Sequence, residues 1–344
     1  MLEYLPWATT TLNTALEKYS KRTFSILDVE LGGGCNYHCL YCDSPDRKKK
    51  CLIPLEAFER LMNTRTFDWV FICGLGEPTF QENYTILIGI LKLCRKYGVK
   101  CSIFSNLSGL TPELIDYIEL DTLYVLFKYD SPNTKTVNAL YGIKTAKEQL
   151  SMIEDVAKHV HLNDGKTNLA ASIVPTRLNY DDVIEVVKKC INLNIFPLLA
   201  ELESSGNGEL NYENLRLTPD ELDMIKQNIE DLLGYEYHIP LCPSVINGIH
   251  FSSDSYITVD DFSGLSCHWF WLEEPRTRRL LKFDEKSSLN NITETIINYR
   301  NTKLMTIKEY LEHGKNVGAS FGGCGGKIES IFRKYIKYHK GEQF

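Results

Sequence analysis

The sequence lacks several features that would assign it to common classes of protein. No run of eighteen apolar residues is present, and a helix needs about that length to cross a bilayer, so the sequence argues against a membrane protein. Its first residues, Met1 to Pro6, lack the basic segment and apolar core of a signal peptide, which argues against export. Internal repeats and low-complexity linkers are absent as well. These absences predict a cytoplasmic, globular protein.

An excess of positive charge is also missing. The net charge of −7 argues against a protein whose main partner is a nucleic acid. Hydrophobic residues make up 43% and charged residues 24% of the chain, which are the values of a folded protein rather than a disordered one. With 344 residues, the chain is long enough for one large α/β domain with an appendage, or for two ordinary domains.

Cysteine, by contrast, is abundant. The chain has eleven cysteines. Disulfides are rare in the cytosol, where clustered cysteines more often bind metal, so their spacing carries the chemical information.

Strand-like and helix-like segments alternate along the first 234 residues. This pattern is typical of βα units that build a parallel sheet. The expected strands are Ser25–Glu30, Trp69–Cys73, Lys100–Phe104, Thr122–Phe127, Leu169–Val174 and Pro197–Glu201. The expected helices are Leu55–Asn63, Asn83–Tyr97, Pro112–Ile118, Thr145–His161, Asp182–Asn192 and a segment from Thr218 to about Leu233.

The pattern changes after Gly234. Gly248–Val259 alternates apolar and polar residues like a β-hairpin with its turn at residues 252–255, and further helices are expected at Leu289–Tyr299 and Ile328–Tyr338. We therefore predict an α/β fold with two parts, residues 1–234 and a small α+β module of residues 235–344.

Three cysteines lie within eight residues, directly after the first expected strand. They are Cys35, Cys39 and Cys42, and the glycines of residues 32–34 precede them. Three thiolates in one flexible loop can bind one four-iron cluster and leave its fourth iron without a protein ligand. A zinc site or an electron-carrying cluster normally has a fourth protein ligand, for which Cys51 is the nearest candidate.

The spacing Cys35-x-x-x-Cys39-x-x-Cys42, with the aromatic Tyr41 before the last cysteine, resembles the signature of the radical S-adenosylmethionine (SAM) superfamily. The resemblance covers residues from about Phe24 to Leu233 and implies a partial (β/α)6 barrel of the TIM type. It also implies a [4Fe–4S] cluster whose open iron binds SAM, with reductive cleavage to a 5′-deoxyadenosyl radical that removes hydrogen from a substrate. A flavodoxin- or ferredoxin-type reductant would supply the electron.

Residues at the ends of the expected strands extend the resemblance, as barrel enzymes build their sites there. Gly74, Gly76, Glu77 and Pro78 resemble the superfamily's Gly-Gly-Glu-Pro motif, which contacts the SAM amino group, although Leu75 departs from it. The resemblance assigns further SAM or substrate contacts to the other strand ends. They are Ser105 and Asn106, where Leu107 replaces a usual glycine, Lys128, which replaces a small hydroxyl residue before Asp130, and Ser172, Arg177 and Glu201.

A second set of cysteines follows the expected barrel: Cys242, Cys267 and Cys324. Cys324 lies among glycines, where a thiol has little to pack against. This arrangement resembles the Twitch and SPASM extensions of radical SAM enzymes and implies an auxiliary [4Fe–4S] cluster. Its remaining iron would be open or closed by His250, His268 or Cys51, and the alternative is three unrelated free cysteines. Cys73, Cys94, Cys101 and Cys190 lie in apolar patterns and are predicted to belong to the core.

Three functions agree with these patterns. The first is a radical SAM enzyme that crosslinks, oxidises or epimerises a ribosomally made peptide, as many relatives with such extensions do. The second is oxidation or rearrangement of a small molecule, such as a sugar, nucleoside or amino-acid derivative, next to an open auxiliary cluster. A noncatalytic iron–sulfur carrier is the third, but it would not need the motif of residues 74–78.

Overall fold

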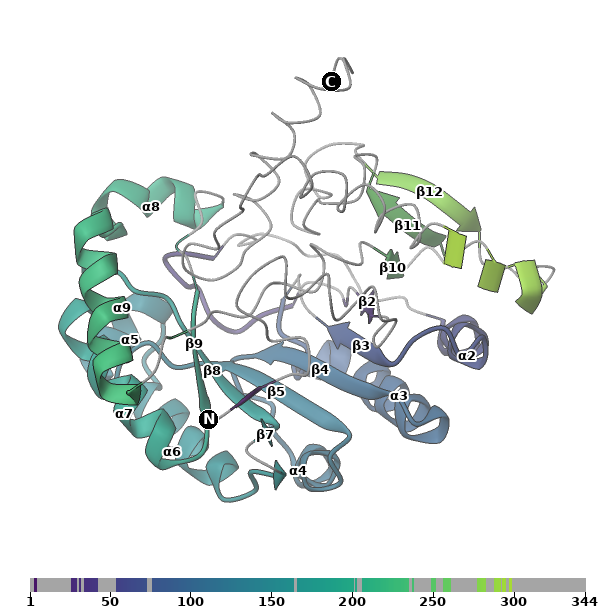
Figure 1. Cartoon of the computed structure of the whole chain (residues 1–344), viewed down its shortest axis with the longest axis horizontal. Helices are drawn as coiled ribbons and strands as arrows, with labels where there is room; N and C mark the ends of the chain where they lie inside the picture. Colours follow the sequence, from purple (N-terminus) through teal and green to yellow (C-terminus); the bar gives the residue numbers. More distant parts are fainter. Residues whose placement is uncertain are drawn as a thin grey trace, which may run out of the picture.

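The computed structural model describes residues 3–4, 26–29, 31, 34–42, 54–72, 76–163, 166–200, 202, 206–234, 237, 249–251, 256–260, 277–282, 288–291, 293–294 and 297–298. These residues form a curved sheet with helices along its outer side (Figure 1). None of the described helices is both long and apolar enough to cross a membrane.

Six parallel strands form the centre of the sheet, and they follow one another in the order of the sequence. They are β2 (Ile26–Val29), β3 (Trp69–Ile72), β4 (Lys100–Ser105), β5 (Leu123–Lys128), β8 (Leu169–Ile173) and β9 (Phe196–Leu199). Every residue of β3, β8 and β9 is buried, as expected for strands that are covered on both faces. All six predicted strands are confirmed, and with them the partial barrel of the TIM type.

Helices connect these strands and cover the outer face of the sheet (Figure 1). Six predicted helices are confirmed, with ends that shift by a few residues: α2 (Leu55–Asn63), α3 (Gln81–Tyr97), α4 (Pro112–Glu119), α6 (Ala146–Ala157), α7 (Val183–Asn192) and α9 (Pro219–Leu233). The start signals act as expected. Thr111 caps α4 by accepting a hydrogen bond from Leu114 N, and Thr218 forms a capping box with Glu221 at the start of α9.

Several short elements were not predicted. Helices α5 (Thr134–Tyr141) and α8 (Asn207–Leu215) follow β5 and β9, and the 3-10 helix η1 (Tyr180–Asp182) precedes α7. A separate small sheet joins β1 (Glu3–Tyr4) to β7 (Lys166–Thr167) and β6 (Leu162–Asn163). Strands of two residues and helices of two turns are too short for a hydrophobic period to reveal them.

The predicted hairpin is confirmed. β10 (Ile249–Phe251) and β11 (Tyr256–Asp260) are antiparallel, with Ile249 opposite Val259, and β12 (Thr277–Lys282) pairs with the far side of β11. β10 also runs parallel to β2, so the hairpin continues the barrel sheet beyond its first strand. The predicted turn at residues 252–255 lies outside the described residues, as does the helix Ile328–Tyr338. Residues 289–291, 293–294 and 297–298 are helical, in agreement with the helix predicted at Leu289–Tyr299. The division into residues 1–234 and 235–344 stays a prediction.

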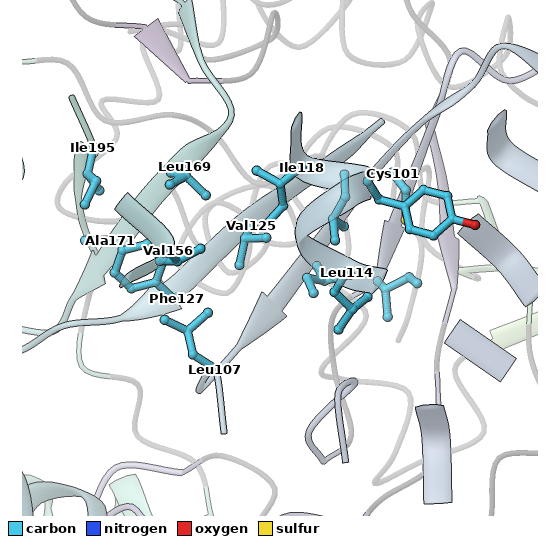
Figure 2. Close-up of a cluster of buried hydrophobic side chains, with 14 of the residues drawn as sticks. Cys101, Leu107, Leu114, Ile118, Val125, Phe127, Val156, Leu169, Ala171 and Ile195 are labelled. Atoms are coloured by element: carbon cyan, nitrogen blue, oxygen red, sulfur yellow. The ribbon is translucent and has the colours of Figure 1, made fainter. Parts of the chain in front are cut away.

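The main core lies between the sheet and its outer helices. Figure 2 shows Leu114, Ile118 and Val156 from helices packed with Val125, Phe127, Leu169 and Ala171 from strands. Cys94, Cys101 and Cys190 are fully buried in this core, as predicted. Cys73 lies outside the described residues.

Candidate functional site

The three cysteines of the loop lie just beyond β2, at the end of the sheet where parallel barrels carry their sites. Cys35 is exposed, Cys39 is buried and Cys42 is half-buried. Desolvation raises the pKa of the Cys39 thiol to about 12, and negative charge on Cys42 and Cys35 adds to this effect. Desolvation of its sulfur also raises the pKa of Cys35, although the residue as a whole is exposed. The three thiols therefore lie close enough to affect one another's ionisation.

The donor set of the loop fits an iron–sulfur cluster. Each of three thiolates can bind a different iron of a four-iron cube, so the thiols need not converge on one point. In the described part of the chain, no three His, Cys, Asp or Glu side chains converge closely enough to bind one metal ion. A four-iron cluster therefore agrees with the residues present.

Helix α5 holds one side of the cysteine loop. The backbone N–H groups of His38 and Leu40 donate to the carbonyl oxygens of Tyr141 and Leu140, at 2.9 and 2.8 Å. Gly142 then ends the helix with a φ of 62°, and a Cβ atom at Gly142 would lie 2.6 Å from the His38 carbonyl oxygen. Only glycine fits both the conformation and the close approach.

Helix α8 also holds the cysteine loop. Its first residue, Asn207, donates from its backbone N–H to the Cys42 carbonyl at 2.7 Å and from its side chain to the Cys39 carbonyl at 3.0 Å. Asn211, one turn later, donates to the Leu40 carbonyl at 3.0 Å. Two helices distant in sequence thus fix the backbone on which Cys39 and Cys42 stand.

Glu77 connects the turn after β3 with the residues after β4. Its carboxylate is buried and accepts four hydrogen bonds. Three reach Oε1, from the Thr79 N–H, the Thr79 hydroxyl and the Ser105 hydroxyl, at 3.0, 2.7 and 2.6 Å. The fourth runs from the Asn106 N–H to Oε2 at 2.6 Å. Burial raises the pKa of Glu77, while these donors act in the opposite direction. Among the described residues, one donor reaches Oε2 and three reach Oε1.

The Glu77 turn also contacts the cysteine loop. The Glu77 N–H donates to the Gly34 carbonyl at 2.7 Å, and Gly76 makes the turn with a φ of 76°, which glycine adopts readily. Pro78 follows and is buried. The motif predicted to lie near SAM is therefore joined directly to the start of the cysteine loop.

Asn106 reaches the first cysteine. Its side-chain amide donates to Asn36 Oδ1 at 2.9 Å and contacts Cys35 Sγ at 3.9 Å. The next residue, Leu107, stands where the superfamily pattern has glycine, and its φ of 67° lies in the left-handed region that favours glycine. A leucine there is strained, but its side chain is only 1% exposed and packs in the core. The backbone at this position thus has a conformation that glycine would adopt without strain.

Tyr41 and Asp130 form a second buried link. The Tyr41 hydroxyl donates to Asp130 Oδ2, and the Val174 N–H donates to Asp130 Oδ1 at 2.6 Å. The Asp130 N–H in turn donates to the Tyr141 hydroxyl at 3.0 Å. Burial raises the pKa of Asp130, and the nearby Lys128 lowers it. Tyr41, Tyr141 and Cys39 share a hydrophobic cluster, which anchors the loop to the barrel.

Of the remaining predicted residues, the structure describes Ser172 and Arg177. Ser172 is buried on β8, and its carbonyl accepts from the Tyr129 N–H at 3.1 Å. Arg177 forms a bidentate ion pair with Glu221 at the start of α9, at 3.1 and 3.3 Å. No hydrogen bond joins the Arg177 side chain to the described residues around the cysteine loop. Gly74, Glu201, Cys242, Cys267 and Cys324 lie outside the described residues.

Sequence reasoning missed four residues that shape the site. Tyr141 on α5 and Asn207 and Asn211 on α8 hold the loop, while Thr79 binds Glu77. A signal for α5 was available, because Asn133 caps it and Gly142 ends it. Nothing local marks the two asparagines, since their partners lie about 170 residues away.

Comparison with known proteins agrees with this geometry. The family model of the radical SAM superfamily matches residues 29–190, which include the cysteine loop and the strands from β3 to β8. The chain is 24% identical over 206 residues to the mycofactocin maturase MftC of Mycolicibacterium smegmatis, covering 57% of this chain and 49% of that protein. It is also 22% identical over 298 residues to the GTPase Obg of Brachyspira hyodysenteriae, covering 78% of this chain and 39% of that protein.

The chain thus spans about half or less of the length of these two relatives. The Gly-x-x-x-x-Gly-Lys-Ser/Thr loop of P-loop GTPases is not found in the sequence, so the name of the second relative carries no function here.

Solved structures show the same fold. Streptococcus suis SuiB bound to SAM has a TM-score of 0.57 at 17% identity, covering 84% of this chain and 72% of SuiB. SuiB bound to its precursor peptide SuiA has a TM-score of 0.56 at 15% identity, covering 80% and 68%.

The parallel barrel and the cysteine loop define a SAM-dependent iron–sulfur fold. The match identifies residues 29–190 as a domain of the radical SAM superfamily. Its members are enzymes that use a [4Fe–4S] cluster and SAM, so the expected class and cofactors are confirmed at the level of the family.

Proposed function

We propose that the protein is a radical SAM enzyme that modifies a ribosomally made peptide by crosslinking, oxidation or epimerisation. The observation that carries the proposal is the cysteine loop. Its three thiols stand together on a backbone that α5, α8 and the Glu77 turn hold by hydrogen bonds. Such a fixed frame is what a site needs to keep a reactive cofactor in one orientation.

Cys35, Cys39 and Cys42 would hold the [4Fe–4S] cluster. When bound there, the cluster supplies one electron that cleaves SAM into methionine and a 5′-deoxyadenosyl radical, which removes a hydrogen atom from the substrate. Glu77 would accept a charge-assisted hydrogen bond from the SAM ammonium through Oε2. Ser105 and Asn106 would fix Glu77 from the neighbouring strand. Tyr41 would anchor the cysteine loop through its hydrogen bond to Asp130. The buried network of these residues excludes water from their hydrogen bonds, which strengthens each of them.

A peptide substrate is supported by the relatives. SuiB was solved with its precursor peptide, and MftC is named as a maturase. The sequence-based alternative is a small molecule oxidised or rearranged beside an open auxiliary cluster.

An auxiliary cluster at Cys242, Cys267 and Cys324 is part of the proposal. It is supported by the predicted hairpin, which follows Cys242 and precedes Cys267 in the sequence and whose strand β10 pairs with β2. A flavodoxin- or ferredoxin-type protein is the proposed reductant.

Isotope transfer tests the function. The anaerobically reconstituted protein is incubated with SAM, a low-potential reductant and a deuterated candidate peptide, such as one encoded by a short reading frame beside the gene. Deuterium should appear in 5′-deoxyadenosine, together with a mass change in the peptide. Deuterium transfer from a small metabolite but from no peptide would reject the peptide and favour the alternative.

Iron content tests the two-cluster proposal. The reconstituted protein should hold roughly eight irons, the content of two four-iron clusters. Replacing Cys35, Cys39 and Cys42 together with Ala should halve the iron, whereas Cys94→Ala, which removes a core thiol, should keep all of it. Cys324→Ala should abolish peptide modification and keep SAM cleavage. Full iron and full modification in Cys324→Ala would reject the auxiliary cluster.

A further inference from the structure

Lys128 places a positive charge beside the cysteine loop. It is the last residue of β5, at the position where the superfamily pattern has a small hydroxyl residue. Its Nζ lies 4.6 Å from the centre of the Tyr41 ring and 5.8 Å from the centre of the Phe104 ring. Both distances are within the range of cation–π attraction. Two aromatic rings therefore fix an ammonium group at the end of the sheet that carries the cysteines.

Tyr41 connects this charge to the thiols, because it lies in the loop directly before Cys42. The Tyr41 hydroxyl donates to Asp130, so the ring next to Lys128 belongs to the link that anchors the cysteine loop. A second buried carboxylate residue, Glu77, contacts the same loop through its N–H, which donates to the Gly34 carbonyl. Lys128 thus places a positive charge beside a loop that two acidic residues also contact.

A fixed cation favours the more negative redox state of a nearby group. Reduction adds one negative charge to a four-iron cluster, and hydrogen bonds and charge around its sulfurs set its potential. We propose that Lys128, held over Tyr41 and Phe104, raises the reduction potential of the cluster bound by Cys35, Cys39 and Cys42. This inference rests on the proposed function and adds a residue that sets how readily the site accepts its electron. It does not require Lys128 to contact SAM.

A redox titration without SAM tests the inference. The reconstituted protein is titrated with a low-potential chemical reductant such as Ti(III) citrate, and the reduced cluster is followed by EPR. In Lys128→Met, the equilibrium constant for cluster reduction should fall about tenfold or more, which for one electron corresponds to a potential about 59 mV lower. Lys128→Arg keeps the charge and should stay near the wild-type value. Lys226→Met, which removes an exposed lysine of α9, should leave the potential unchanged.

A second variant covers the case in which Lys128→Met does not assemble its cluster. Phe104→Leu keeps the lysine and removes one of the two rings that fix it, so it should lower the potential in the same direction by a smaller amount. An unchanged potential in Lys128→Met, or in Phe104→Leu where Lys128→Met cannot be loaded, would overturn the inference. A failure of the proposed function is seen separately, because EPR of the reduced wild type would then show no cluster signal that added SAM changes.

Discussion

Glu77→Gln tests the buried carboxylate that joins the two strand ends. The change keeps the shape of the side chain but replaces one acceptor oxygen with a donating NH2 group. Three donors surround Oε1 and one donor, the Asn106 N–H, faces Oε2. The amide oxygen would therefore take the Oε1 position, and its NH2 group would face the Asn106 N–H.

The expected cost follows from that mismatch. A buried donor without an acceptor costs about 1 to 3 kcal/mol, and the three remaining bonds lose their charge assistance, so unfolding should become easier by about 2 to 4 kcal/mol. The bond from the Glu77 N–H to the Gly34 carbonyl involves only backbone and should persist. The loop, and with it the iron content, should therefore survive the change.

Two assays measure these effects. Urea unfolding of the metal-free protein gives the change in stability, with Glu148→Gln on the exposed face of α6 as the control. Titration of the reconstituted protein with SAM gives the change in SAM affinity. Losing a charge-assisted hydrogen bond should weaken SAM binding by about 1.5 to 3 kcal/mol. An unfolding free energy equal to that of the control would refute the claim that the buried Glu77 carboxylate stabilises the folded chain. Unchanged SAM affinity would remove Glu77 from the SAM site.

Three further changes test other parts of the site. Asn211→Ala removes the donor to the Leu40 carbonyl and should lower the free energy of unfolding by about 1 kcal/mol, measured by urea unfolding. It should also slow iron loading, measured by an iron assay. A loading rate equal to that of the wild type would show that α8 does not support the loop. Leu107→Gly relieves the strain of a left-handed leucine, about 1 to 2 kcal/mol, but removes a buried side chain that contributes about 2 to 5 kcal/mol. The variant should therefore be less stable than the wild type. A more stable variant would contradict this balance. In the metal-free protein, alkylation of Cys39, with its pKa of about 12, should be slower than alkylation of Cys35. The rate for Cys39 should rise about tenfold per pH unit from pH 7 to 9, because only the thiolate reacts. Mass spectrometry of the labelled peptides measures both rates, and a pH-independent rate for Cys39 would contradict the raised pKa.

Much of the barrel could be predicted because its signals are local. Apolar runs such as Trp69–Ile72 identify buried strands without further information, and Thr218 with Glu221 identifies the start of α9. The order of the strands follows from the βα pattern, and the position of the cysteine loop after the first strand follows from the sequence directly. The residues at the strand ends were predicted as SAM or substrate contacts because parallel strands bring their ends together, and these roles stay predictions.

The contacts that hold the site could not be predicted in the same way. Asn207 and Asn211 bind carbonyl groups of the loop, and no property of an asparagine indicates which distant carbonyl it will meet. The partner of Arg177 could not be predicted either. Its side chain pairs with Glu221, a residue of the cap of α9, and its contact with SAM or substrate stays a prediction.

The central claim is that Cys35, Cys39 and Cys42 hold a cluster with an iron open to SAM. EPR of the reduced, reconstituted protein, recorded with and without SAM, tests it most directly. We predict that SAM changes the spectrum of one cluster in the wild type, and that this SAM-sensitive signal is absent when the three cysteines are replaced by Ala. A SAM-sensitive signal that survives in the triple variant, or a wild-type spectrum that SAM leaves unchanged, would contradict the account.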